Sequence, residues 1–164
     1  MGETVIEQTL VLVKPDGVQR GLIGEIIKRF ENHGLKITGL KLVQVDKKFA
    51  EQHYGAHKGK SFFEPLVNFL IESPVVAMVV EGADAIANVR KIVGSTEPST
   101  AAPGTIRGDY AHVSYKYADA KKIAIKNLIH ASSDANDAKK ELEQWFSKKE
   151  IYKYKRSDDY MTIE

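Results

Sequence analysis

The sequence predicts an α/β or α+β sandwich in which helices cover a sheet. Strand-like and amphipathic helix-like segments alternate along the 164-residue chain, which is the pattern of a layered mixed fold. The composition, 43% hydrophobic and 28% charged, is typical of a soluble globular protein, and the length suits one domain over residues 1–164. We expect the helices on one face of the sheet. Alternation alone leaves open whether the strands are parallel or antiparallel.

Spacing of apolar residues locates the elements of the first half. Residues 8–13 are predicted to form a strand, because 10–13 are apolar without alternation, which is typical of a strand buried on both faces. The KPDG sequence at 14–17 predicts a turn after it. Apolar residues at helical spacing follow over 21–33. A second strand over 35–45 changes phase near Gly39, which indicates a β-bulge.

The middle of the chain also contains both helix and strand patterns. Asp46 is the expected N-cap of a short helix that ends at His53. A second apolar stripe predicts a helix over 60–72, and the most apolar stretch, 75–80, predicts a central strand. A third helix is predicted over 84–93.

The last third is richer in polar loops. Residues 94–108 contain many Gly, Pro, Ser and Thr and predict a long loop, which in a compact domain is usually functional or disordered. We expect a helix over 119–126, a short strand at 128–129 and a helix over 134–146. Residues 147–164 form a polar tail with Lys and Tyr.

Composition and charge exclude several classes of protein. A net charge of +2 is too small to recruit nucleic acid or anionic lipid by its field alone. The absence of Cys excludes disulfide frameworks, thiolate zinc sites and cysteine nucleophiles. The longest apolar run, 74–80, is far shorter than the roughly 20 residues of a membrane span. Residues 1–4 are acidic where a signal peptide would be basic, so we expect a cytoplasmic protein.

Two apparent binding motifs are weak. Residues 55–61 (GAHKGKS) are one residue too short for a Walker phosphate loop and follow a helix-like segment instead of a buried strand, so we reject that interpretation. His53 and His57 could share a helix face as a metal pair. No third ligand is obvious, and a polar surface helix explains them more simply.

Three cations are candidates for a phosphate site. Lys14 follows the first strand, Arg90 lies on the third helix, and Arg107 lies in the long loop with Thr96 nearby. Each alone is most simply a solvated charge. Brought together by the fold, the three would form an array suited to a di- or triphosphate, although spacing alone does not show that they converge.

His130 is the candidate nucleophile. It follows an apolar pair and precedes a helix N-cap, so a core or capping histidine is the simpler interpretation, and a neutral imidazole that accepts a phosphoryl group is the functional one. Glu141, two turns into the next helix, could reach back to orient it. With Phe63 buried, Phe62 would point away from the core and could stack on a base. Tyr54 is expected at the surface unless its hydroxyl reaches the cations.

Four segments together resemble the nucleoside diphosphate kinase family. They are TLVLVKPDGV at 9–18, residues 74–82, PGTIRGD at 103–109 and the NxxHxS pattern at 127–132. The resemblance covers residues 8–146 in the family's order. It implies a ferredoxin-like βαββαβ α+β sandwich, with helices packed on a four-stranded antiparallel sheet. It also implies ping-pong transfer of the terminal phosphate of a nucleoside triphosphate, mainly ATP, to a nucleoside diphosphate through a phosphohistidine.

The resemblance implies a role for each matching position. His130 matches the nucleophile, and the phosphate-binding groups are matched by Lys14, Arg90, Arg107 and Thr96. The contacts to base and sugar are matched by Phe62, Leu66 and Asn127. The residues that surround the histidine are matched by Tyr54, Ser132 and Glu141. Mg²⁺ would be held mainly by the nucleotide's phosphates, so no protein ligand is assigned. Stacking accepts any base, so broad base specificity is expected.

The sequence departs from the usual family pattern in three places. Ala131 stands where Gly is usual, and Ser133-Asp134 stand where an Asp usually follows the serine directly. A segment within 110–126 is longer by about ten residues, and it could extend the mouth of the site, change subunit contacts or form a surface helix.

We expect an active enzyme that uses ATP, GTP, CTP, UTP and their deoxy forms and assembles as a homo-oligomer, a hexamer more readily than a tetramer. We expect no membrane association, and nucleic acid is an improbable partner. One alternative is a catalytically weakened nucleotide-binding regulatory protein of the same fold. Another is partner or nucleic-acid binding through the basic tail, whose cations are Lys148, Lys149, Lys153, Lys155 and Arg156. The simpler interpretation of these five is a solvated face.

Overall fold

A four-stranded antiparallel sheet forms the centre of the computed structural model, which describes residues 6–163. The acidic residues 1–4 lie outside this range. The strands, in the sheet order β2-β3-β1-β4, are Lys36–Val43, Val75–Ala83, Ile6–Val13 and Ile129–Ala131. Every neighbouring pair is antiparallel. The predicted antiparallel α+β sandwich, with the first and third strands as central neighbours, is therefore confirmed.

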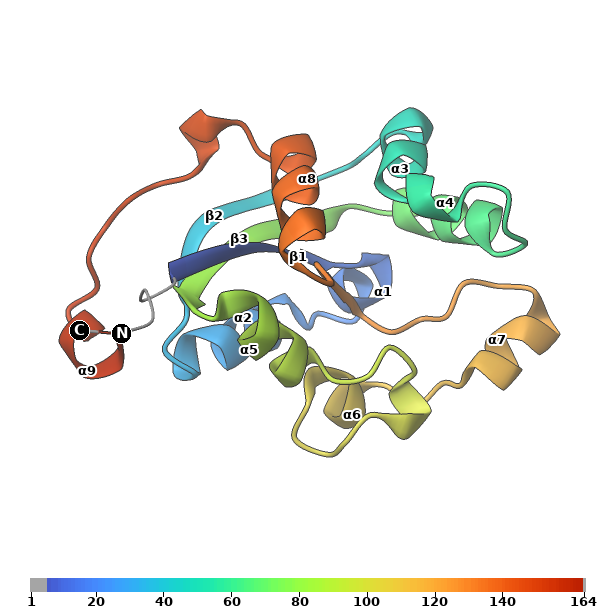
Figure 1. Ribbon diagram of the computed structural model, residues 1–164. Coiled ribbons are helices and arrows are strands. Elements are labelled where there is room, and N and C mark those ends of the chain that lie inside the picture. The colour runs from blue at the N-terminus through green and yellow to red at the C-terminus, as the bar shows by residue number, and fades with distance from the viewer. Residues whose placement is uncertain (1–5, 164) are drawn as a thin grey trace.

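Helices cover both faces of the sheet (Figure 1), so the expectation of a single covered face was wrong. The helices α2 (Ile23–Asn32) and α5 (Ala85–Val93) lie on one face, and α3 (Lys47–His53), α4 (Phe63–Ile71) and α8 (Ala135–Trp145) lie on the other. The cause is visible in β1, whose side chains alternate between two apolar cores. Val11 and Val13 belong to one core, Leu10 and Leu12 to the other, and all four are fully buried.

The edge strand β2 contains the predicted β-bulge, because its pairing with β3 shifts between Ile37 and Gly39. A Cβ on Gly39 would lie about 3.0–3.1 Å from Val79, from Phe146 and from a backbone oxygen, so only glycine fits there without displacement. The bulge leaves the Thr38 carbonyl free to accept from the Tyr152 N–H at 2.8 Å, which begins the docking of the tail along β2.

The tail contains a 3-10 turn (Lys148–Glu150) and α9 (Asp159–Thr162). The Tyr154 hydroxyl donates to the Ile37 carbonyl, and Lys36 pairs with buried Asp159 at 3.0 Å. Arg156, expected to be a solvated cation, instead donates to the Leu35 carbonyl and pairs with Asp158.

Two loop predictions and one helix prediction need correction. The 14–17 turn is the start of α1 (Pro15–Gln19), because proline at the first helical position is already set to the helical φ. The long loop 94–108 contains a 3-10 turn (Pro98–Thr100) and ends in α6 (Ile106–Tyr110), which Thr105 caps. The helix placed at 119–126 is α7, Tyr115–Lys121. Among the residues that the structure describes, no helix is long and apolar enough to cross a bilayer.

Candidate active site

The site lies where the end of β1 meets the start of β4. His130 pairs with Leu12 across these two strands, and the Lys14 N–H donates to the Leu128 carbonyl at 2.8 Å. Leu128 is buried with a φ of 72°, a left-handed conformation that is strained for a leucine. The Leu128 N–H donates to the Asp16 carboxylate at 3.0 Å. Asp16 on α1 therefore fixes the backbone on which the histidine stands.

A pocket of about 540 Å³ opens beside His130. Eight of the predicted site residues line it, namely Lys14, Tyr54, Phe62, Leu66, Thr96, Arg107, Asn127 and His130. Phe62 is 45% exposed while its neighbour Phe63 is 8% exposed, so the predicted division of this pair between pocket and core is confirmed. The remaining wall comes from α7 and the chain after it, including Tyr115, Asp119 and Ile123.

Buried cations give the inner end of the pocket its charge. Burial, and then the nearby Arg107 charge, lowers the pKa of Lys14 to about 8. Arg107 donates to the carbonyls of Asn127, Gly94 and Ile129, which takes three of its five N–H groups. Its pKa is lowered to about 10, by burial first and by Arg90 second, so it keeps its charge at neutral pH. Two guanidinium N–H groups therefore remain for an anion.

Arg90 on α5 takes a different position from the other two cations. It is not among the side chains that line the pocket, and its guanidinium donates to the Ala131 carbonyl at 3.3 Å. Its charge nevertheless lowers the pKa of both Arg107 and His130. The fold thus brings all three predicted cations around the histidine, with Arg90 in an outer position.

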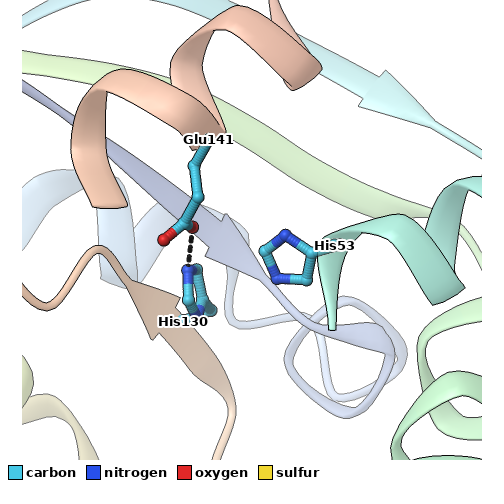
Figure 2. A group of neighbouring side chains, drawn as sticks. All are labelled: His53, His130 and Glu141. Atoms are coloured by element: carbon cyan, nitrogen blue, oxygen red, sulfur yellow. Dashed lines mark hydrogen bonds and ion pairs between the residues drawn. The ribbon is translucent and has the colours of Figure 1, made fainter. Parts of the chain in front are cut away.

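His130 has its two ring nitrogens in different surroundings. Nε2 contacts the carboxylate of Glu141, which reaches back from α8 (Figure 2). Burial, followed by the charges of Lys14, Arg107 and Arg90, lowers the pKa of the imidazole to about 3. The ring is therefore neutral at physiological pH. With Nε2 on the carboxylate, Nδ1 is the nitrogen available to a substrate.

The surrounding polar groups fix this arrangement. Ser132 accepts from the Leu10 N–H at 3.3 Å, and its hydroxyl also bonds the Glu141 carboxylate. Asn127 donates to the Thr96 carbonyl at 2.8 Å, while its own side-chain oxygen is buried with no partner among the described residues. That orphaned oxygen is ready to accept from a ligand hydroxyl. Asp134 caps α8 by accepting from the Asp137 N–H, so the extra serine before it does not disturb the helix start.

His53 and His57, considered as a metal pair, lie in different elements, α3 and the 3-10 turn Gly55–His57. His53 instead lies near His130 and Glu141, and the possible ligand atoms of the three are no more than 4.8 Å apart. However, the Trp145 indole N–H donates to His53 Nδ1 at 3.1 Å. Neutral His53 therefore carries its proton on Nε2 and presents a donor there, whereas a metal would need a lone pair.

Sequence reasoning missed several of these residues. Asp16 was assigned to a turn, and nothing in the sequence links it to Leu128 because the contact depends on the pairing of β1 with β4. Tyr115, Asp119 and Ile123 lie in the lengthened segment. The local spacing of residues does not show that this segment lies over the pocket. The only available signal was the proximity of that segment to the chemical motifs on both sides.

The geometry defines a class of protein, namely a nucleotide-binding phosphotransferase on an antiparallel α+β sandwich. A base-sized aromatic platform, buried cations and a neutral, oriented histidine meet in one pocket. The family model for nucleoside diphosphate kinase matches residues 7–151, and the chain belongs to this family.

Relatives agree over nearly the full length. A nucleoside diphosphate kinase of Pyrococcus furiosus is 51% identical over 94% of this chain and 92% of its own, and one of Listeria monocytogenes is 50% identical over 94% and 98%. A Borrelia burgdorferi nucleoside-diphosphate kinase, solved with vanadate and ADP as a transition-state mimic, matches with a TM-score of 0.92 and 44% identity over 96% of both chains. A Halobacterium salinarum enzyme in complex with CDP matches with a TM-score of 0.87 and 42% identity, over 98% of this chain and all of that one.

Proposed function

We propose that this protein transfers the terminal phosphate of a nucleoside triphosphate, mainly ATP, to a nucleoside diphosphate through a phosphohistidine at His130 Nδ1. The observation that carries this proposal is the asymmetry of the His130 ring. Glu141 occupies Nε2, and the free nitrogen belongs to a neutral imidazole that lines the cation-bearing pocket. A neutral, oriented imidazole beside buried cations is what a phosphoryl acceptor requires.

Two half-reactions share the site. In the first, the Nδ1 lone pair attacks the γ-phosphorus, and the nitrogen–phosphorus bond forms as the bond to the β–γ bridging oxygen breaks. The nucleoside diphosphate leaves with that electron pair. In the second, a terminal β-phosphate oxygen of the acceptor diphosphate attacks the phosphohistidine, and Nδ1 regains its lone pair. Glu141 accepts from Nε2–H throughout and stabilises the positive charge that develops on the ring.

The nucleotide would lie across the pocket with its base outward. The exposed ring of Phe62, with Leu66 beside it, is suited to stack on a base of any kind. The orphaned Asn127 oxygen would accept from a sugar hydroxyl. Lys14 and Arg107 would bind the phosphates at the inner end, where Arg90 adds charge from outside, and the Thr96 hydroxyl would donate to a phosphate oxygen.

Two further side chains would support the phosphoryl group. Burial raises the pKa of the Tyr54 hydroxyl above its ordinary value, so this group stays a donor beside the histidine. Ser132 bonds Glu141 and so helps to fix the carboxylate.

The lining residues suit a magnesium ion that arrives on the nucleotide. Lys14 and Arg107 give the inner end of the pocket positive charge, and Asp119 is the one carboxylate among the lining side chains that the structure describes. Six protein oxygens, which Mg²⁺ prefers as ligands, are not gathered there. The ion would therefore be coordinated by the phosphates and water, and when bound it neutralises part of the triphosphate charge. The cations of the chain bind the charge that remains.

Intact mass of the full chain after incubation with ATP and Mg²⁺ tests this proposal. One acid-labile phosphoryl group is expected, which excess GDP discharges to give GTP. His130→Ala should gain none, while the control His33→Ala, at an exposed position after α2, should behave as wild type. Thermal stabilisation by nucleotide without any adduct would contradict the proposal and favour the regulatory alternative.

We also infer assembly into a homo-oligomer, a hexamer more readily than a tetramer. The support is the edge strand β2, on which Leu40 is 54% and Leu42 is 64% exposed. The single-domain organisation over 1–164 and the cytoplasmic location stay predictions from the sequence.

A further inference from the structure

His53 is a partly buried histidine that the proposed mechanism does not use. It ends α3 and packs between Trp145 of α8 and His130 of β4. Its ring centroid lies 4.8 Å from that of His130 and 5.4 Å from that of Trp145, in edge-to-face geometry with both. A histidine in contact with the candidate nucleophile is in a position to affect the reaction.

The hydrogen bond from Trp145 determines which nitrogen of His53 carries the proton. An indole N–H can only donate, so Nδ1 must be the unprotonated acceptor of the 3.1 Å contact. The proton of the neutral ring is then on Nε2. Burial, and next the neighbouring His130, lowers the pKa of His53 to about 3, so the ring stays neutral.

The His53 ring faces His130 and Glu141. Figure 2 shows the His53 ring directed from α3 toward the contact between Glu141 and His130. One ring nitrogen of each histidine and a carboxylate oxygen of Glu141 lie within 4.8 Å of one another, a separation that one water molecule can bridge with two hydrogen bonds. Because Nδ1 of His53 accepts from Trp145, Nε2 is the nitrogen left for such a bridge. The same side chains, with Gln52, Asp137 and Gln144, line a second cavity of about 630 Å³, which offers room for that water.

We propose that His53 is a positioning residue for phosphoryl transfer. Oriented by Trp145, it directs its Nε2–H to the Glu141 carboxylate and keeps that carboxylate accepting from His130 Nε2–H, so that Nδ1 stays unprotonated. The inference rests on the proposed function, because it assigns a role in presenting the phosphoryl acceptor. His53 forms no bond to the nucleotide.

Other charged and titratable groups also act on the carboxylate. From other elements, the groups around Glu141 are His53 at the end of α3, Tyr54 directly after α3, His130 on β4 and Ser132 directly after β4. From its own helix and the N-cap before it, they are Asp134, Asp137, Lys140 and Glu143. Burial raises the pKa of the Glu141 carboxyl most, the charges of Asp137 and Asp134 raise it further, and the hydrogen bond with Ser132 lowers it. An N–H donated by neutral His53 would act in the same direction as Ser132, because it stabilises the ionised carboxylate. Loss of His53 is therefore expected to raise the pH at which the carboxylate gains a proton.

The experiment compares wild type with His53→Leu, His53→Gln and the control His33→Gln in the full chain. Single-turnover phosphorylation by ATP and Mg²⁺ is followed by intact mass over a series of pH values, and nucleotide affinity is measured separately. His53→Leu should slow phosphorylation on the order of 10-fold or more, shift its acid limb to higher pH and leave affinity unchanged. His53→Gln, whose amide accepts and donates at similar places, should restore most of the rate. The control should match wild type.

Nitrogen-15 spectra of histidine-labelled protein provide a readout that does not depend on turnover. Wild-type His130 should carry its proton on Nε2, and His53→Leu should shift this equilibrium toward Nδ1–H. If His53→Leu does not fold, Trp145→Phe, which removes the donor and keeps the His53 ring, should cause the same shift.

The outcomes separate this inference from the proposed function. Failure of the wild type to form an adduct would overturn the proposed function itself. An active wild type with a His53→Leu variant of unchanged rate and acid limb would overturn only the positioning role. Equal loss in both His53 variants, with the acid limb unmoved, would assign His53 to packing and also overturn the inference.

Discussion

The Glu141 carboxyl contacts Nε2 of His130, so the tautomer of the imidazole depends on whether this carboxyl is ionised. Burial is the main influence on that ionisation. Burial raises the pKa of this carboxyl to about 7. Above that pH the carboxylate accepts from Nε2–H and leaves Nδ1 free. Below it the protonated carboxyl would donate to Nε2, and the ring proton would move to Nδ1, where it would block the proposed attack.

Activity should therefore fall as the pH drops through about 7. Glu141→Gln replaces the anionic acceptor by a neutral amide that does not titrate, accepts more weakly from Nε2–H and does not stabilise positive charge on the ring. We therefore expect kcat to fall by roughly 10²- to 10⁴-fold, with a weaker pH dependence. The pH profile of single-turnover phosphorylation measures both effects. A Glu141→Gln enzyme with the wild-type acid limb would show that another group controls it.

Residue-level prediction from the sequence succeeded where a local pattern was sufficient. Adjacent aromatic residues on a helical stripe were enough to separate Phe62 from Phe63, because one helical step turns the side chain by about 100°. Asp16 was not found, because its contact with Leu128 depends on the pairing of two strands more than a hundred residues apart in the chain. Local spacing carries no information about such a pair.

At the scale of elements, the lengthened segment forms a wall of the pocket beside His130. Ser114 caps α7, and the Tyr115 N–H donates to the Glu97 carboxylate at 2.9 Å, which ties the helix to the 3-10 turn Pro98–Thr100. The helix lies next to the pocket because it is anchored at its start. The sequence predicts this helix too late in the chain, at 119–126. Lys122 adopts a left-handed conformation and ends the helix, and the apolar residues that follow it lie outside any helix.

The double variant Tyr115→Ala/Ile123→Ala should raise the KM for nucleoside diphosphates and change kcat little. The lost apolar contact is worth about 1–2 kcal/mol, which corresponds to a roughly 5- to 30-fold rise. Steady-state kinetics and calorimetric titration measure it. Tyr117→Ala on the same helix is the matched control, since Tyr117 is 52% exposed and does not line the pocket. An equal rise in this control would contradict the assignment of α7 to the pocket wall.

At the scale of the whole molecule, the antiparallel sheet explains why distant motifs share one site. The order β2-β3-β1-β4 places the end of β1 beside the start of β4, so Lys14 and His130 meet although more than a hundred residues separate them. The sequence patterns alone left the strand directions open. Only the family resemblance specified the antiparallel order, and with it the convergence of the cations.

The same sheet has an exposed apolar edge. Among the described strands, β2 pairs only with β3, and Leu40 and Leu42 lie exposed along it. Unpaired strand edges favour association with another chain. Leu42→Lys should shift the protein toward smaller species in sedimentation velocity, whereas Met161→Lys, at another exposed apolar position, should not. A wild-type protein that sediments as a monomer would contradict the homo-oligomer.

The contact between Trp145 and His53 also gives the molecule an optical reporter. Trp145 is the only tryptophan in the chain, and its side chain is 3% exposed, so ultraviolet emission comes from a single, well-shielded indole. The hydrogen bond from that indole ends on a histidine that packs against His130. A doubly charged phosphoryl group placed on His130 would change the electric field at the indole. The fluorescence of unlabelled protein should then follow formation and discharge of the intermediate in real time.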